Sequence, residues 1–288
     1  MSKDILAMIQ SSMPQFSKGQ KNIARFILEN YDKAAFMTAS KLGKTVNVSE
    51  STVVRFAAEL GYDGYPSMQK ALQEMIRNKL TTVQRIEVSN DRLGDQDVLT
   101  KVLQSDMEKL RMTMETMDRE EFAAVVDAIV GARRIYILGV RSSAALSDFL
   151  TFYFNLLFEN VRQVKSTLSS EMFEQMLRVS EGDVVIGISF PRYSTRTVRA
   201  MKFARDQGAT VVALTDSELS PLCETANLRL LAKSDMASFV DSLVAPLAVI
   251  NALIVAVGRK KVAEVTETFG YLERIWDEYE VYTKRTNP

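Results

Sequence analysis

The sequence predicts a two-domain α/β protein, in which an all-α helix-turn-helix domain precedes a doubly wound parallel sheet. Its 288 residues exceed the roughly 250 at which a single core usually stops growing. Residues 1–79 carry only helical periodicity, broken by small polar residues that suit helix starts. From residue 133 onward, short β-rich runs alternate with helical stretches, which is the pattern of βαβ units. We therefore expect a first domain over 1–79, a linker over 80–96 and a second domain over 97–288.

Composition places the chain among ordinary globular proteins. It is 47% hydrophobic and 25% charged, and Cys223 is its one cysteine, which excludes an intramolecular disulfide. Residues 1–10 lack the basic and apolar regions of a secretion signal. The longest apolar stretch, 243–257, is too short to cross about 30 Å of hydrocarbon and contains Asn251, so we expect a buried helix there. These features favour a reducing, cytoplasmic setting and no association with a membrane.

The zero net charge hides an asymmetry between the two parts of the chain. Residues 1–79 contain 11 Lys and Arg against 7 Asp and Glu, a formal charge of +4. The other residues contain 25 against 29, a charge of −4. This is the direction expected if the first domain meets a polyanion, although a charged face is more often simply solvated.

The first domain begins with a well-marked helix. Ser17 and Gln20 have the spacing of a capping box, and the apolar residues that follow have the spacing of one helix face. We expect this helix over about 18–30. Thr38 can cap a short second helix that turns Leu42 inward.

A third helix follows a tight connection at Asn47. Ser49 can cap it, and its buried side is formed by Val53, Phe56, Ala57 and Leu60. Gly61 suits the left-handed position after a helix because it lacks Cβ, and a further helix begins near Tyr65 and Pro66. The second and third helices are therefore joined by a turn of three or four residues, which is a helix-turn-helix arrangement.

The exposed face of the third helix carries side chains that suit DNA. With the apolar residues turned inward, Ser51, Thr52 and Arg55 face outward near the helix start, where a recognition helix presents residues to base edges. Small hydroxyls and one Arg fit the major groove. We predict a DNA-binding surface of Ser49, Ser51, Thr52 and Arg55. From the pattern alone, ordinary surface residues behind a capping serine remain the alternative.

The second domain opens with helical periodicity over 98–114 and 122–129 and continues with five β-rich runs. These runs are Arg134–Leu138, Val161–Lys165, Asp183–Ser189, Thr210–Thr215 and Asn227–Leu231. Strands that alternate with helices form a parallel sheet covered on both faces. Ligands bind such sheets beyond the carboxyl ends of the strands, so the loops that follow the runs are where a site is expected.

Two of these loops have the composition of an anion site. Residues 139–143 follow the first strand and residues 189–195 follow the third, and each loop opens a helix. Hydroxyls and unpaired backbone N–H groups at a helix N-terminus favour negative charge, and an Arg can add bidentate contacts to a phosphate or carboxylate. The predicted ligand-binding residues are Arg141, Ser142, Ser143, Ser189, Arg192, Ser194 and Thr195. Each serine alone could instead be a structural helix cap.

Other chemistries have little support in the sequence. Residues 215–222, after the fourth strand, contain an Asp and two serines that can close the pocket. A dinucleotide-binding fold is the obvious rival, but no Gly-x-Gly-x-x-Gly follows the first strand. The chain has no His and one Cys, so we expect neither a metal site nor a cofactor.

The first domain contains a familiar pattern in Phe36-Met37-Thr38-Ala39-Ser40-Lys41-Leu42-Gly43, in residues 48–56 (VSESTVVRF) and in residues 60–65 (LGYDGY). On these residues, nearly all of 1–77 resembles the DNA-binding domain of the RpiR/MurR family of bacterial sugar-responsive regulators. This resemblance implies that residues 49–60 form the recognition helix and that the regulator acts as a dimer.

Residues 97–260 resemble the sugar isomerase (SIS) domain that follows in the same family. Residues 139–145, 187–195, 215–227 and 239–243 carry this likeness. The family's second loop usually reads Ser-x-Ser-Gly-x-Thr, whereas here Pro191 and Arg192 replace the middle Ser-Gly. Arg141 likewise stands where a Gly is common. The resemblance implies a sugar phosphate ligand, and the departures leave another acidic metabolite open.

Three functions follow from these observations. The first is a homodimeric or homotetrameric regulator that binds a duplex operator and senses a small acidic sugar or sugar phosphate. The second is a sugar phosphate isomerase with an accessory DNA-binding domain, for which Glu171 is the available general base. The third is a DNA-binding scaffold whose second domain only dimerises. Because no second acid–base partner is visible, we predict the regulator and no catalytic residue.

Overall fold

The computed structural model describes residues 5–77, 81, 83–86, 97–165, 169–234 and 240–282. The chain divides into two compact units, Met1–Leu103 with Met236–Asp241 and Gln104–Asp235 with Ser242–Pro288. Most of the expected linker over 80–96 lies outside the described residues, and residues 83–86 within it are helical.

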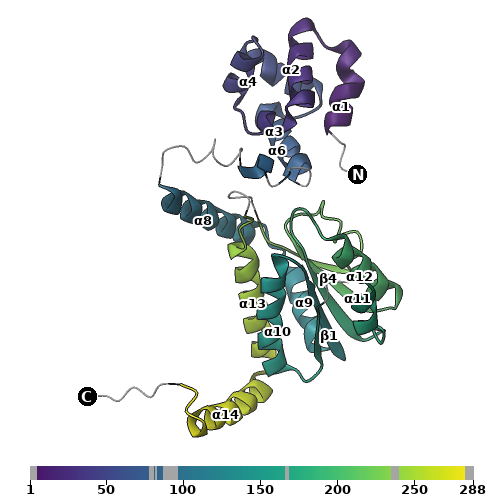
Figure 1. The fold of residues 1–288 in the computed structure, drawn as a ribbon, viewed down its shortest axis with the longest axis vertical. Coiled ribbons are helices and arrows are strands. Elements are labelled where there is room, and N and C mark those ends of the chain that lie inside the picture. Colours follow the sequence, from purple (N-terminus) through teal and green to yellow (C-terminus); the bar gives the residue numbers. More distant parts are fainter. Residues whose placement is uncertain are drawn as a thin grey trace, which may run out of the picture. The chain divides into compact units, whose positions relative to one another are not determined.

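The first unit is all helical (Figure 1). Its elements are α1 (Ile5–Ser12), the 3₁₀ helix Met13–Gln15, α2 (Lys18–Glu29), α3 (Tyr31–Ala34), α4 (Ala39–Thr45), α5 (Glu50–Glu59) and α6 (Gly64–Arg77). Apolar side chains of α1, α2, α4, α5 and α6 share one core, in which Ile23, Leu42 and Phe56 are completely buried. These helices depend on that shared core, since isolated helices of this length are marginal in water.

The predicted helix caps of the first unit are confirmed. Ser17 and Gln20 form the reciprocal capping box, the Thr38 hydroxyl accepts from the backbone N–H of Lys41 at 3.2 Å, and the Ser49 hydroxyl accepts from that of Thr52 at 3.3 Å. Gly61 has the expected left-handed backbone, with φ +82°. The next helix begins at Gly64 rather than at the predicted 65–66, so that Pro66 is its third residue.

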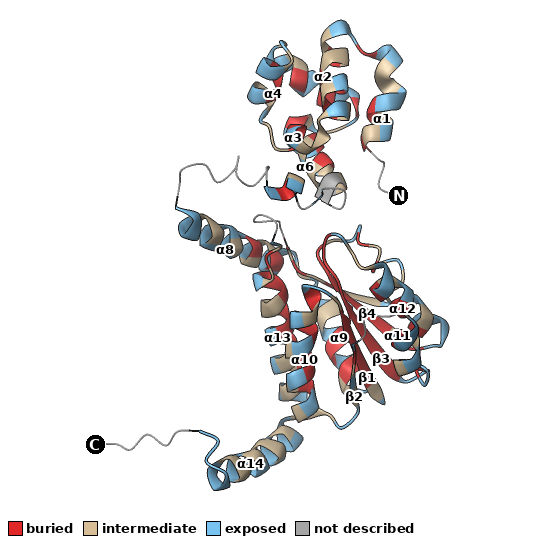
Figure 2. Cartoon of the chain, in the orientation of Figure 1, coloured by how far each residue is buried: buried red, intermediate tan, exposed pale blue. Residues whose placement is uncertain are grey.

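The second unit contains the predicted parallel sheet. Its strands are β1 (Arg134–Gly139), β2 (Val161–Val164), β3 (Asp183–Ile188), β4 (Thr210–Thr215) and β5 (Leu228–Leu231), in the order β2-β1-β3-β4-β5. Every pair is parallel. The central strands are buried along nearly their whole length, as expected for a sheet covered on both faces (Figure 2).

Helices cover both faces of this sheet. One face carries α9 (Arg119–Val130), α10 (Ser143–Leu157) and α13 (Val244–Lys260), and the other carries α11 (Ser169–Gln175) and α12 (Thr195–Asp206). The α13 helix contains the apolar stretch predicted to be a buried helix, and its residues Val249, Ile250 and Leu253 lie in the core. Within the described residues, we find no helix that is both long and apolar enough to span a bilayer.

Two further helices, α8 (Val98–Thr116) and α14 (Val262–Glu278), lie outside the layers that cover the sheet. The α8 helix precedes α9 and crosses the division between the two units. The α14 helix follows α13 after a single residue and turns away from the sheet (Figure 1).

Candidate functional sites

The predicted DNA-binding residues lie together at the start of α5. Ser49, Ser51 and Arg55 are exposed and Thr52 is half-buried. The Ser49 Oγ lies 2.8 Å from the Ser51 Oγ and 2.8 Å from the Thr52 Oγ1. The Arg55 Nε donates to the Ser51 carbonyl at 3.3 Å, which holds the guanidinium along the helix surface. The result is a small patch of hydroxyls beside one positive charge, on a helix that begins in solvent.

The turn before α5 depends on a close backbone approach that the sequence pattern did not reveal. The Val48 N–H donates to the Gly43 carbonyl at 2.9 Å. A Cβ on Gly43 would lie 2.8 Å from the Val48 carbonyl oxygen, closer than real Cβ contacts come. Gly43 therefore sets how near α4 comes to the start of α5, and with it the presentation of the patch.

The second candidate site lies where the strand order reverses. The chain passes from β1 to β2 on one side and then crosses to β3 on the other, so the loops after β1 and β3 lead to helices on opposite faces of the sheet, α10 and α12. Such a switch point is where parallel sheets of this kind commonly bind ligands. Gly139 and Ile188 are register partners at the carboxyl ends of β1 and β3. The loops over 140–143 and 189–194 therefore begin next to each other, which the order of the β-rich runs along the sequence did not indicate.

Both loops contain an Arg in an unusual backbone conformation. Arg141 has φ +57° and Arg192 has φ +66°, in the left-handed region that favours glycine. Both side chains are exposed. Positive φ in a residue with a long side chain costs free energy and persists where the surroundings impose it. At these two positions, where the family resemblance leads us to expect Gly, the chain keeps a backbone conformation typical of Gly and adds a guanidinium.

The serines of the second loop make bonds that shape it. The buried Ser189 Oγ accepts from the Ser194 backbone N–H at 3.0 Å, and the Ser194 Oγ caps α12 by accepting from the Thr197 N–H at 3.3 Å. Each hydroxyl keeps its own hydrogen to donate. The exposed Thr195 opens α12 beside them.

The first loop differs in how its serines are used. Ser142 is exposed at the N-cap of α10, and its side chain forms no capping hydrogen bond within the described residues. Ser143 is buried behind it. A Cβ on Gly139 would lie 2.5 Å from the Ser143 carbonyl oxygen, so the close passage of strand and helix requires glycine. Ser142 thus presents a hydroxyl that no helix cap uses.

A third loop is tied to the second by a contact that the sequence did not indicate. The Tyr193 hydroxyl donates to the buried Asp216 carboxylate at 2.7 Å, across the ends of β3 and β4. The Thr215 hydroxyl bonds to Ser220 at 2.8 Å. The sequence predicts that the loop containing Asp216 helps to close the pocket, but its contact with Tyr193 in the loop after β3 is seen only once the strands are paired.

Few of the described side chains near the carboxyl ends of the strands could act as a general acid, a general base or a nucleophile. Glu171 is exposed in the first turn of α11. In the described part of the chain, no group of three or more Asp, Glu, Cys and His side chains could hold a metal ion. Burial raises the pKa of the Cys223 thiol to about 11, with a further contribution from the charge of Glu218, which disfavours the nucleophilic thiolate.

Known protein families match the two parts of the chain separately. A model of the rpiR-family helix-turn-helix domain matches residues 3–79, and a model of the SIS domain matches residues 128–256. A helix-turn-helix transcriptional regulator of Haemophilus influenzae is 30% identical over 232 residues, 78% of each chain. The transcriptional regulator HexR of Escherichia coli is 29% identical over 226 residues, 78% of this chain and 76% of its own.

Solved structures show the same fold. NanR of Vibrio vulnificus, in complex with ManNAc-6P, matches 96% of this chain and 99% of its own with TM-score 0.59 and 23% identity. The sugar isomerase domain of an RpiR transcription factor from Sphaerobacter thermophilus matches 62% of this chain and 99% of its own, with TM-score 0.59 and 27% identity.

A helix-turn-helix unit followed by a SIS sheet defines a class of DNA-binding regulators. This chain belongs to the RpiR family of helix-turn-helix transcriptional regulators, as its resemblance predicted.

Proposed function

We propose that the chain regulates genes of carbohydrate metabolism and is itself controlled by a sugar phosphate or related acidic metabolite. In this proposal residues 1–79 bind a duplex operator through α5, residues 80–96 link the domains, and residues 97–288 sense the metabolite and hold a cytoplasmic homodimer or homotetramer together. Ligand binding changes operator affinity to the extent that the ligand binds the DNA-competent and incompetent states differently.

One observation carries the sensing half of the proposal. Two loops that leave neighbouring strands at the switch point each combine an exposed Arg, a serine hydroxyl and the start of a helix of 12 or more residues. The backbone N–H groups at a helix N-terminus and a guanidinium can together bind a phosphate. The NanR protein, which has this fold, was solved with the phosphosugar ManNAc-6P, which supports the same ligand class here.

The test separates sensing from DNA binding. A thermal-shift panel of sugar phosphates and phosphorylated sugar acids identifies a ligand of the full chain, and selection from random duplexes supplies an operator. We expect Ser189→Ala/Ser194→Ala to lower the affinity for that ligand on the order of a hundredfold, while operator binding without ligand is retained. Wild-type ligand affinity in this variant would place the pocket elsewhere. Turnover of a panel member would favour an isomerase over a sensor.

A further inference from the structure

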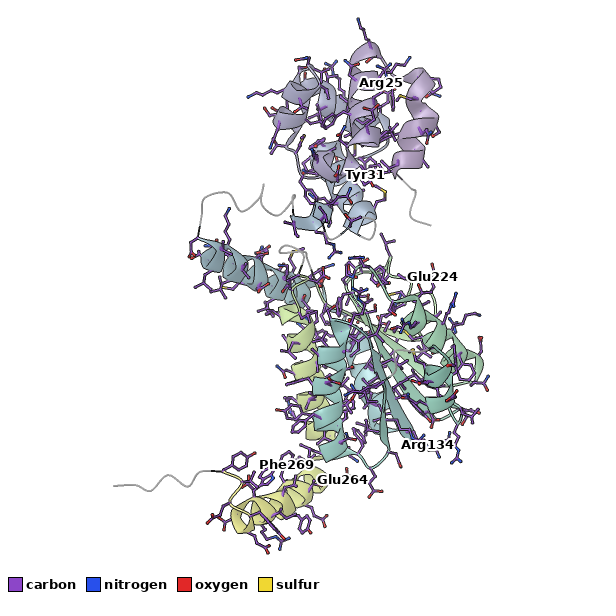
Figure 3. All side chains as sticks on the ribbon, in the orientation of Figure 1. Arg25, Tyr31, Arg134, Glu224, Glu264 and Phe269 are labelled. Atoms are coloured by element: carbon purple, nitrogen blue, oxygen red, sulfur yellow. The ribbon has the colours of Figure 1, made fainter. Side chains whose placement is uncertain are left out.

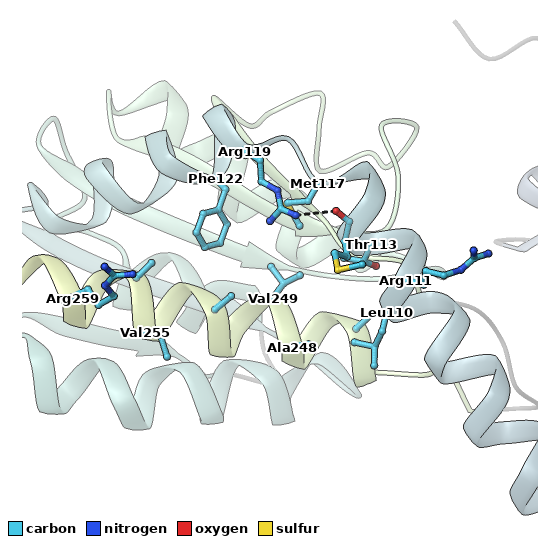
Figure 4. Close-up of a pocket in the computed structure, with 14 residues that line it drawn as sticks. Leu110, Arg111, Thr113, Met117, Arg119, Phe122, Ala248, Val249, Val255 and Arg259 are labelled. Atoms are coloured by element: carbon cyan, nitrogen blue, oxygen red, sulfur yellow. Dashed lines mark hydrogen bonds between the residues drawn. The ribbon is translucent and has the colours of Figure 1, made fainter.

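An apolar groove lies on the face of the second unit that carries α9 and α13, apart from the loops at the sheet edge. Its volume is about 610 Å³, and its walls come from α8, the first turn of α9 and the length of α13 (Figure 4). Leu110, Met114, Phe122 and Val255 are among the apolar side chains that line it. Met114 and Val255 are each about 60% exposed, at 62% and 61%, which is unusual for large apolar side chains in a concave surface. Such a surface indicates an interaction site.

The charges in this groove are of one sign. Arg111, Arg119 and Arg259 line it, and no carboxylate is found among its described lining residues. Arg111 pairs with glutamates of its own helix α8, and Arg119 donates to the Met114 carbonyl at 3.0 Å. Arg259 is exposed in the last turn of α13. An occupant of this groove should therefore be apolar along its middle and acidic along its edges.

The α14 helix has these properties. Within the described part of the chain none of its residues is buried. The half-buried Val265, Phe269, Leu272 and Trp276 lie at helical spacing and form one apolar stripe, continued by the exposed Tyr279. The helix carries five carboxylates, Glu264, Glu267, Glu273, Asp277 and Glu278, against the single cation of Arg274. Figure 3 shows Phe269 and Glu264 on this helix, away from the sheet.

The length of α14 also fits the groove. Both α13 and α14 have 17 residues, and at about 1.5 Å per residue each spans about 25 Å. The helix can therefore contact the α13 wall along its whole length.

The α14 helix of the same chain does not reach this groove. Lys261 alone separates the end of α13 at Lys260 from the start of α14 at Val262. Antiparallel packing of two consecutive helices needs a loop of about 2–5 residues. Because the connection is shorter, α14 turns away from α13 instead of folding back along it, and it contacts α10. An α14 helix that occupies the groove would therefore come from a second chain.

We propose that two copies of this chain exchange their α14 helices, each laying its apolar stripe in the groove between α8 and α13 of the other. The arrangement is two-fold, so each pair of chains buries two equal interfaces. The acidic flanks of α14 meet Arg111, Arg119 and Arg259 of the partner, which fixes the orientation of the helix. The inference rests on the proposed homo-oligomer and specifies the surface that forms it.

A charge exchange in the full chain tests this. One variant is Arg119→Glu/Arg259→Glu in the groove, and the other is Glu273→Lys/Asp277→Lys, on one flank of the apolar stripe of α14. All four side chains are exposed, so each variant should fold, and a circular dichroism melt checks that it does. Like charges then face each other in either homodimer, and we expect the dimer dissociation constant from sedimentation equilibrium to rise at least about tenfold.

The mixture of the two variants gives the decisive result. In a heterodimer both interfaces again pair opposite charges, so a 1:1 mixture should dimerise with near wild-type affinity. Arg119→Gln/Arg259→Gln should weaken the homodimer less than the reversal does. A matched control, Arg199→Glu/Lys202→Glu on α12 at the other sheet face, should leave the dimer unchanged.

The outcomes separate this inference from the proposed function. A dimeric wild type with unaffected variants overturns the α14 exchange and leaves the regulator proposal standing. Weakened variants that do not rescue each other overturn docking between chains. A wild type that is monomeric at micromolar concentration overturns both the exchange and the proposed homo-oligomer.

Discussion

The two units build their sites in opposite ways. The proposed DNA-binding patch comes from residues 49–55, one continuous segment whose hydroxyls bond to each other on the helix that carries them. The proposed ligand-binding loops, 140–143 and 189–194, are distant in sequence and begin next to each other because β1 pairs with β3. The first site depends on the capped helix α5 and its position in the domain. The second depends on the strand order that places β1 beside β3, and on the strained backbone of Arg141 and Arg192. A local site can be read from a sequence directly, and an assembled one only through its topology.

The largest expected effect concerns the assembled site. Arg141→Gly/Arg192→Gly keeps a backbone that glycine adopts readily, so it removes two guanidinium groups with little change to the fold. Each charged contact contributes about 1.5–3 kcal/mol, and we expect affinity for the acidic ligand to fall on the order of a hundredfold or more. Isothermal titration with a ligand from the thermal-shift panel measures this. Unchanged affinity would mean that neither Arg contacts the ligand.

The local site should respond next most strongly. Arg55→Ala should weaken operator binding by about 1–3 kcal/mol and relax preference at one base position if Arg55 contacts a guanine. Fluorescence anisotropy on the selected operator and on random duplex distinguishes this from a phosphate contact, which would weaken both equally. Full affinity on both would remove α5 as the recognition helix.

The turn before α5 is expected to matter through stability. Gly43→Ala places a Cβ against the Val48 carbonyl and should cost about 1–3 kcal/mol of the first unit's stability by overpacking. Lys44→Ala, an exposed neighbour in the same helix, is the control and should cost less than about 0.5 kcal/mol. Chemical denaturation followed by circular dichroism compares them. Equal stability of the two variants would show that the turn relaxes without cost.

The smallest effect compares two serines at helix starts. Ser194 caps α12 and Ser142 makes no capping bond in the described structure. Ser194→Ala should therefore lower stability by about 1 kcal/mol and Ser142→Ala by less than about 0.5 kcal/mol. Ser142→Ala should nevertheless weaken ligand binding. A destabilised Ser142→Ala variant with unchanged ligand affinity would give Ser142 a structural role instead.

Local patterns determined what could be predicted from the sequence. The caps at Ser17, Thr38 and Ser49 and the five strands were predictable because hydrogen-bonding side chains and β-rich runs act over a few residues. The left-handed backbone of Arg141 and Arg192, the Tyr193–Asp216 bond and the fit at Gly43 were not. Each depends on atoms that tertiary packing brings together, which no local pattern encodes. The sequence indicates that Arg141 and Arg192 stand where the family resemblance leads us to expect Gly, and in the structure both residues adopt the left-handed backbone that Gly favours.

The division of labour between the two units is tested most directly by one reciprocal measurement. Operator affinity and ligand affinity are both determined for the wild type, for Arg55→Ala and for Arg141→Gly/Arg192→Gly, all as full chains. We expect Arg55→Ala to lose operator affinity and keep ligand affinity, and the double variant to do the reverse, with its operator binding no longer responding to ligand. Loss of both affinities in either variant, while the chain remains folded, would contradict the separation of DNA binding and sensing.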